Sequence, residues 1–158
     1  MSEAEGRTIA AIDLGSNSFH LVVARLRPDE RDFVVIDRLK QPVRLRMGLD
    51  DTGRLSTEAQ NRALECLSRF GERLAGLPRG DVRAVGTNTL RAARNGLPFL
   101  IRARRALGHK IEVISGYDEA RLIYRGVARD LAGDGRRLVV DIGGGSTELV
   151  VGDGPCPS

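Results

Sequence analysis

A pattern of twelve residues occurs twice in this chain, at 12–23 and again at 140–151. The two copies align without a gap, and six of the twelve positions are identical: Asp, Gly, Ser, Leu, Val and Val. Each copy is an apolar strand that ends in Asp, a turn of small residues and a second apolar strand. The repeat therefore predicts a fold in which two similar hairpin turns face each other.

The apolar patterns between the two copies predict the rest of the architecture. Strands are expected over 8–14, 19–27, 33–39, 82–85, 111–114, 138–141 and 147–151. Helices are expected over 57–75 and 98–107 and from a cap at Ser115 through 131, with a helical turn at 89–93.

This order of elements predicts an α/β fold of the ribonuclease-H-like type, with a mixed sheet and flanking helices. We expect one complete subdomain over 7–132 and the first hairpin of a truncated second subdomain over 136–152. Actin, heat-shock ATPases and sugar kinases are built from two such units. The Gly- and Pro-rich segment 153–158 is predicted to be a disordered tail.

Composition excludes several classes of protein. The chain has 158 residues, and no apolar run approaches the roughly 20 residues that a membrane helix needs. The polar N-terminus is unlike a secretory signal, and two cysteines give no disulfide framework, so a cytoplasmic protein with a buried Cys66 thiol is expected. The net charge of +4 comes from scattered arginines, which favours compositional bias over a polyanion-binding surface, and no specific nucleic-acid partner is expected.

The two turns of the repeat are candidate phosphate-binding loops. The first contains Gly15, Ser16, Asn17 and Ser18, and the second contains Gly143, Gly144, Gly145, Ser146 and Thr147. Small residues let backbone N–H groups approach an anion, although Gly and Asn also favour an ordinary hairpin turn. Because the pattern is repeated, we predict that both turns bind phosphate.

Three carboxylates lie beside these turns. Asp13 and Asp141 end the first strand of each hairpin, and Glu148 lies on the strand that leaves the second turn, where the first copy has His20. Carboxylates next to bound phosphate repel it unless a cation lies between them, which indicates Mg²⁺. Capping of the turn is the alternative role for the aspartates, and a surface glutamate is the alternative for Glu148.

Two further candidates follow other predicted strands. Asp118 is the expected partner of the Ser115 cap, which leaves Glu119 free to face a cleft as a general base or to interact with the helix dipole. Arg91 could bind a phosphate through two parallel hydrogen bonds, or could be a surface arginine on a short helix.

These segments together resemble the N-terminal part of the exopolyphosphatase and guanosine pentaphosphate phosphohydrolase family. The matching stretches are 13–20, 86–91, 114–124 and 141–150, in the family's order, and they cover about residues 8 to 152. The resemblance implies Mg²⁺-dependent release of terminal phosphate from inorganic polyphosphate, with guanosine pentaphosphate as the alternative substrate. Gly86, Thr87 and the triple glycine favour the polyphosphate branch mildly.

The resemblance also implies roles for individual residues. Glu119 matches the proposed catalytic base, Asp141 and Glu148 match residues that hold the metal or order water, and Arg91 matches a phosphate-contacting arginine. Tyr117 and Asp118 stand where the family often has a polar residue and Glu. The family has a second lobe after the second turn, so we expect this polypeptide alone to be inactive or nearly so, and a family-type homodimer is doubtful for it.

Two rival functions remain open from the sequence. A kinase or ATPase of the same fold also pairs two glycine turns around a nucleotide. A non-catalytic module that binds polyphosphate could use the same turns without turnover, and its binding would weaken steeply with salt.

Overall fold

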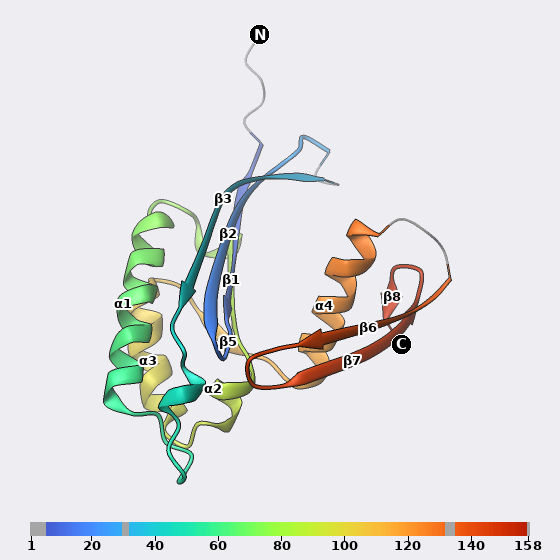
Figure 1. The fold of residues 1–158 in the computed structure, drawn as a ribbon. Helices are drawn as coiled ribbons and strands as arrows, with labels where there is room; N and C mark the ends of the chain where they lie inside the picture. The colour runs from blue at the N-terminus through green and yellow to red at the C-terminus, as the bar shows by residue number, and fades with distance from the viewer. Residues whose placement is uncertain (1–5, 30–31, 132–134, 158) are drawn as a thin grey trace.

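The computed structural model describes residues 6–29, 32–131 and 135–157, which form two sheets joined by a helix (Figure 1). The strands are β1 (Thr8–Leu14), β2 (Ser18–Leu26), β3 (Phe33–Pro42), β4 (Val82–Gly86), β5 (Ile111–Val113), β6 (Arg136–Ile142), β7 (Thr147–Asp153) and β8 (Cys156–Pro157). The helices are α1 (Thr57–Arg73), α2 (Asn88–Ala92), α3 (Gly96–Leu107) and α4 (Gly116–Asp130), with short 3₁₀ turns η1 (Arg46–Gly48) and η2 (Arg79–Asp81).

The larger sheet has the strand order β3-β2-β1-β4-β5. Strands β1, β2 and β3, all expected from the sequence, form an antiparallel meander, while β4 pairs parallel to β1 and β5 pairs parallel to β4. Helices α1 and α3 lie side by side on one face of this sheet (Figure 1). The mixed sheet with flanking helices is therefore confirmed.

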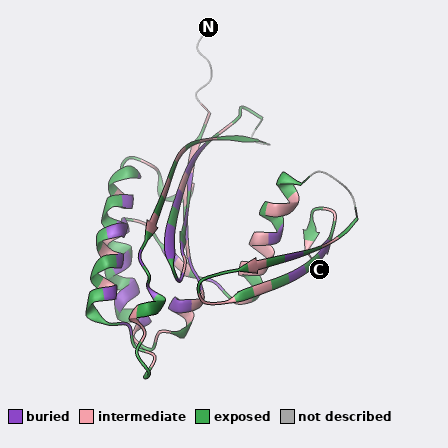
Figure 2. Ribbon diagram, viewed as in Figure 1, coloured by how far each residue is buried: buried purple, intermediate pink, exposed green. Residues whose placement is uncertain are grey.

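The main core lies between this sheet and its two helices, where the buried residues gather (Figure 2). Helix α1 begins after Ser56, which caps it because the Ser56 hydroxyl accepts a hydrogen bond from the Ala59 amide. Its buried face carries Cys66 at 1% exposure, and burial raises the pKa of this thiol to about 11. The prediction of a buried Cys66 thiol is confirmed, and the raised pKa makes this thiol a poor nucleophile.

A second, smaller core joins α4 to the hairpin β6–β7. Its buried residues are Tyr124, Val139 and Val150, and Val139 lies directly opposite Val150 in the strand register. The Tyr124 hydroxyl donates a hydrogen bond to the Gly154 carbonyl at 2.9 Å. Helix α4, which the sequence analysis placed in the first subdomain, therefore shares its core with the second hairpin, because its apolar face meets β6 and β7. The predicted boundary at 132 lies outside the described residues.

The C-terminal segment differs from its prediction. The disordered tail expected over 153–158 is instead the end of β7, a turn and the short strand β8, in which Asp153 pairs with Cys156 and Gly152 pairs with Pro157. Gly154 takes a positive φ of 54° at this turn, a conformation that glycine adopts at little cost. Glycine and proline here mark a tight turn, so the prediction of disorder was wrong for 153–157.

None of the described helices is long and apolar enough to cross a membrane.

Candidate active site

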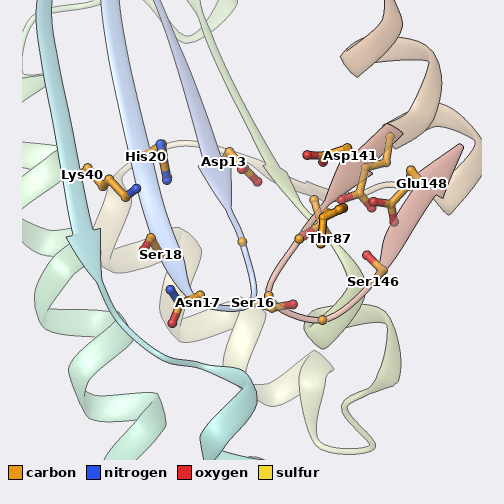
Figure 3. Close-up of a pocket in the computed structure, with 16 residues that line it drawn as sticks. Asp13, Ser16, Asn17, Ser18, His20, Lys40, Thr87, Asp141, Ser146 and Glu148 are labelled. Atoms are coloured by element: carbon orange, nitrogen blue, oxygen red, sulfur yellow. The ribbon is translucent and has the colours of Figure 1, made fainter. Parts of the chain in front are cut away.

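The two repeated turns meet at a cavity of about 410 Å³ (Figure 3). The first sheet and the second hairpin form opposite walls. The lining residues are Asp13, Gly15, Ser16, Asn17, Ser18, His20, Lys40, Thr87, Glu119, Asp141, Ile142, Gly143, Gly144, Gly145, Ser146 and Glu148. Of the candidates named from the sequence, Thr147 and Arg91 do not line this cavity. All the others do.

The two turns have glycine at the same position, and in both turns it lies close to the carbonyl of the residue three positions later. A Cβ atom on Gly15 would lie 2.8 Å from the Ser18 carbonyl oxygen, and one on Gly143 would lie 3.2 Å from the Ser146 carbonyl oxygen. The Gly143 amide also donates a hydrogen bond to that Ser146 carbonyl at 2.9 Å. Both turns fold back tightly on themselves, so the sequence repeat is also a structural repeat.

The next two glycines of the second turn are needed because the first turn packs against them. A Cβ atom on Gly144 would lie 2.8 Å from Cβ of Asn17, and one on Gly145 would lie 2.5 Å from the Ser16 hydroxyl oxygen. Separations this short leave no room for a side chain. The sequence analysis assigned the glycine run to the approach of a phosphate. The structure adds direct contact between the two turns as a second reason.

Arg46 connects the two turns. Its backbone amide donates a hydrogen bond to the Ser16 carbonyl at 3.0 Å, and its guanidinium donates to the Gly145 carbonyl at 3.3 Å. The same guanidinium lies 3.4 Å from the Asn88 side-chain oxygen. One residue of η1 therefore contacts the first turn, the second turn and the start of α2. Sequence reasoning missed Arg46, because no local pattern announces a contact with a residue 99 positions away.

The first turn is also supported from beneath. The Thr89 hydroxyl, only 1% exposed, donates a hydrogen bond to the Ser16 hydroxyl oxygen at 2.7 Å. Ser16 accepts this bond and keeps its own hydroxyl proton, which it can donate to a ligand. Thr87 and Ser18 are buried beside it. The turn is therefore held in place before any anion arrives.

Glu119 lies in the first turn of α4 and faces the cavity as predicted. Ser115 caps this helix by accepting a hydrogen bond from the Asp118 amide, and its hydroxyl donates to the Asp118 carboxylate at 2.7 Å. Arg91 donates to one Glu119 carboxylate oxygen at 2.8 Å and to the Ile114 carbonyl at 2.8 Å. Arg91 thus fixes the orientation of Glu119, and a direct contact between Arg91 and phosphate stays a prediction.

Four carboxylates surround the cavity, contributed by Asp13, Glu119, Asp141 and Glu148. Asp13 is open to the cavity, yet the surrounding walls raise its pKa to about 6, chiefly by removing water and further through the charges of Glu119 and Asp141. The cavity is thus strongly acidic, and an anionic ligand requires cations there.

These carboxylates fit a magnesium ion in one respect. Mg²⁺ keeps several waters and needs only one or two protein carboxylates, and Asp13 and Asp141 are near enough for their charges to interact. Within 6–29, 32–131 and 135–157, no three His, Cys, Asp or Glu side chains are arranged to hold a metal ion. The donors suit a hydrated ion shared with phosphate better than a site built from protein ligands alone.

A row of side chains crosses the first sheet at the edge of the cavity. Asp13 on β1 pairs in register with His20 on β2, and His20 pairs with Lys40 on β3 (Figure 3). Burial lowers the pKa of His20, and the charge of Lys40 lowers it further. The sequence analysis did not select Lys40. Lys40 can be assigned to the cavity only from the alternation of side chains along β3 and the register of Lys40 with His20. That register is not known until the pairing of the strands is known.

Comparison with known sequences places the chain among phosphatases. A family model described as the Ppx/GppA phosphatase family matches residues 22–157. A guanosine-5'-triphosphate,3'-diphosphate pyrophosphatase of Vibrio vulnificus is 52% identical over 155 residues, which is 98% of this chain and 31% of that protein. A protein of the same name from Aliivibrio fischeri is 52% identical over 145 residues, 92% of this chain and 29% of its own length. The chain thus spans about three tenths of the length of these relatives.

Solved structures agree with the sequence comparison. An exopolyphosphatase from Cytophaga hutchinsonii superposes with a TM-score of 0.87 at 32% identity, covering 96% of this chain and 48% of that chain. A PPX-GPPA enzyme of Aquifex aeolicus superposes with a TM-score of 0.83 at 33% identity, covering 96% and 50%. An inorganic polyphosphate/ATP-glucomannokinase from Arthrobacter, at 12% identity and a TM-score of 0.53, shares the fold alone.

Proposed function

Because the chain belongs to the Ppx/GppA phosphatase family, we propose that its cavity binds and hydrolyses the terminal phosphate of a linear phosphate chain. The observation that carries this proposal is the packing of two glycine turns against each other at one cavity, with Glu119 on its wall. The proposed reaction is attack of water on the terminal phosphorus, with release of orthophosphate.

The two turns supply the phosphate-binding groups in this proposal. Backbone amides and the hydroxyls of Ser16, Ser18 and Ser146 surround the cavity, and such donors stabilise charge on a transferring phosphoryl group. Phosphoryl transfer depends on position and charge neutralisation more than on covalent chemistry. A turn that is already held by Thr89 and Arg46 loses little entropy on binding.

Glu119 is the proposed general base. Arg91 occupies one of its carboxylate oxygens, so the other oxygen is left to accept a proton from the attacking water. The Arg91 contact makes it a positioning residue for Glu119 in this proposal. Asp141, Glu148 and Asp13 would hold Mg²⁺ with phosphate oxygens, and the ion when bound would neutralise charge on the phosphate.

The substrate has two candidates. Inorganic polyphosphate is favoured by the structural similarity to an exopolyphosphatase. Guanosine pentaphosphate is favoured about equally, because sequence relatives at 50–52% identity are named guanosine-5'-triphosphate,3'-diphosphate pyrophosphatases. Both substrates present a terminal phosphate on a phosphate chain, so the same turns serve either one.

Exposed apolar residues on the outer face of the second hairpin affect the rate of hydrolysis that we expect. Leu138, Val140, Ile142, Leu149 and Val151 are all exposed there, between 49% and 81%. Exposed apolar patches of this kind mark surfaces that pack against other protein. We expect the 158-residue chain to bind phosphate chains but to turn over slowly by itself, since one wall of its cavity rests on a weakly supported hairpin.

The test compares orthophosphate release from tripolyphosphate, long-chain polyphosphate, guanosine pentaphosphate and ATP, with and without Mg²⁺. Replacement Glu119→Gln should lower any release by about 10²- to 10⁴-fold. The matched control is Glu112→Gln, which removes an exposed glutamate paired with Lys110 outside the cavity. Equal release by Glu119→Gln and the unaltered chain would contradict the role of Glu119, and preferred hydrolysis of ATP would favour the kinase or ATPase alternative.

A further inference from the structure

Lys40 is the only lysine or arginine among the residues that line the described cavity. The other charged lining residues are the four carboxylates, and Arg91 and Arg46 contact the site from outside the lining. A cavity proposed to bind a polyanion therefore contains a single fixed positive charge. The position of Lys40 determines where in the cavity the negative charge of a bound ligand is most stable.

Lys40 lies at one end of the cavity. It stands on the edge strand β3, opposite His20, and its side chain points along the row toward His20 and Asp13 (Figure 3). Asp141 and Glu148 lie on the opposite wall, on the second hairpin. The cavity is thus polarised, with a cation at the β3 end and carboxylates at the β6–β7 end.

Lys40 has no carboxylate partner in the part of the chain that the structure describes, where the ion pairs involve other residues. Its side chain is exposed and lines the cavity. An unpaired ammonium at the mouth of a phosphate site can donate three hydrogen bonds to phosphate oxygens.

A linear phosphate chain must leave the site in some direction. With its terminal phosphate between the two turns, the next phosphates can run toward the carboxylates of the second hairpin or toward Lys40. The ammonium favours the second path, because in the proposed function the carboxylates on the first path are engaged by the cation at the terminal phosphate.

We propose that Lys40 forms a second anion subsite, which binds the phosphates that follow the terminal one and so directs the chain of the substrate toward β3. This inference rests on the proposed function and adds to it the orientation of the substrate. The ligand class is a linear tri- or longer phosphate, free or carried by a nucleotide. Orthophosphate has only one phosphate group, so it cannot occupy the terminal site and a second subsite at once.

The alternative is that Lys40 only prevents the edge strand β3 from pairing with strands of other chains. Charged residues on edge strands prevent unwanted pairing with other chains, and β3 is an edge of its sheet. That role predicts no effect of phosphate chains on Lys40.

The chain offers a clean experiment because Lys40 and Lys110 are its only lysines. Mild acetylation followed by mass spectrometry reports both side chains separately in one sample. Tripolyphosphate with Mg²⁺ should slow acetylation of Lys40 several-fold, and orthophosphate should leave it nearly unchanged. Lys110, which pairs with Glu112 on the surface, should react equally in all samples.

Calorimetry supplies the second measurement. Replacement Lys40→Met should weaken tripolyphosphate binding by about tenfold to a hundredfold, the usual effect of losing a hydrogen bond to a charged group, with little change for orthophosphate. The control Lys110→Met should bind both ligands as the unaltered chain does.

The outcomes of these experiments distinguish the Lys40 subsite from the proposed hydrolysis of phosphate chains. Tight tripolyphosphate binding without protection of Lys40, and with no change in Lys40→Met, would overturn the subsite and leave the proposed function standing. Failure of the unaltered chain to bind tripolyphosphate would overturn both. Loss of orthophosphate and tripolyphosphate binding together in Lys40→Met would show a general charge effect and also contradict the subsite.

Discussion

The two hairpins of this chain share a sequence pattern and a turn, yet their surroundings differ. Hairpin β1–β2 lies in the middle of a five-stranded sheet, and its core face is covered by α1 and α3. Hairpin β6–β7 forms a three-stranded sheet with β8 and shares a small core of three buried residues with α4. The same sequence pattern is therefore packed against a large core in the first hairpin and against a small core in the second.

The charged residues beside the two turns also differ. Asp13 and Asp141 occupy equivalent places, but the residue opposite Asp13 is His20, with Lys40 beyond it, while the residue opposite Asp141 is Glu148. One wall of the cavity thus carries mixed charge and the other is acidic. The charged residues beside the two turns therefore differ, although the turns themselves are alike.

The largest expected effect comes from removing the support of the second hairpin. Replacement Tyr124→Ala deletes a fully buried ring and its hydrogen bond to Gly154, at a cost of about 3 to 5 kcal/mol. Hydrogen exchange should show that β6–β7 loses protection while β1–β2 keeps it. Equal loss in both hairpins would show that the two cores fold as one unit and would break the comparison.

The next effect tests the contact between the turns. Replacement Gly145→Ala forces a methyl group against the Ser16 hydroxyl and should destabilise the contact by about 1 to 3 kcal/mol. Thermal unfolding and phosphate binding by calorimetry would both report it. Gly126→Ala is the control, because a Cβ atom there meets nothing within 4 Å and alanine favours the helix. An unchanged affinity in Gly145→Ala would mean that the turns act independently.

A smaller effect is expected at Arg46. Replacement Arg46→Ala removes the side-chain bonds to Gly145 and Asn88, worth about 1 kcal/mol together because they are long and exposed. Amide exchange in 143–147 should speed up several-fold, while 15–18 changes little. The exposed Arg105 on α3 gives a matched control, Arg105→Ala, and the same acceleration in that variant would rule out a specific link.

The smallest effect concerns the acidity of the cavity. The pKa of Asp13 is raised from 3.8 to about 6 in the folded chain, so stability is lost as the pH rises from about 4 to about 6, and the loss is complete above pH 6. Asp13→Asn should therefore be more stable than the unaltered chain at pH 7 to 8, by about 1 kcal/mol after allowance for solvent screening, and equal to it near pH 4.

Urea unfolding at several pH values measures this difference, with Asp51→Asn, an exposed carboxylate outside the cavity, as the control. Addition of Mg²⁺ should stabilise the unaltered chain at pH 7 more than it stabilises Asp13→Asn. A stability difference that grows toward low pH would contradict the sign of the shift.

Much of the fold and many residues of the candidate site could be predicted from local sequence. The meander, the Ser56 and Ser115 caps, the left-handed Gly108 that ends α3 and the two turns all rest on patterns a few residues long. Most of the cavity residues followed from the repeat, since equal sequences make equal turns.

What could not be predicted depends on pairing across long distances. Lys40 became a cavity residue only through the register of β3 with β2, and Arg46 only through its reach to Gly145. Arg91 was selected as a candidate phosphate contact that follows a strand, but only the packing of α4 shows that it contacts Glu119. The misjudged tail shows that a Gly-Pro segment can be a tight turn when a neighbouring strand offers hydrogen bonds.

The central claim is that the two turns bind one phosphate chain together. The most direct measurement is a nuclear magnetic resonance titration of the unaltered chain with tripolyphosphate and Mg²⁺, following the backbone amides of 15–18 and 143–146. The account predicts that both sets of amides shift and saturate at the same ligand concentration. Shifts in one turn only, or two different saturation points, would contradict it.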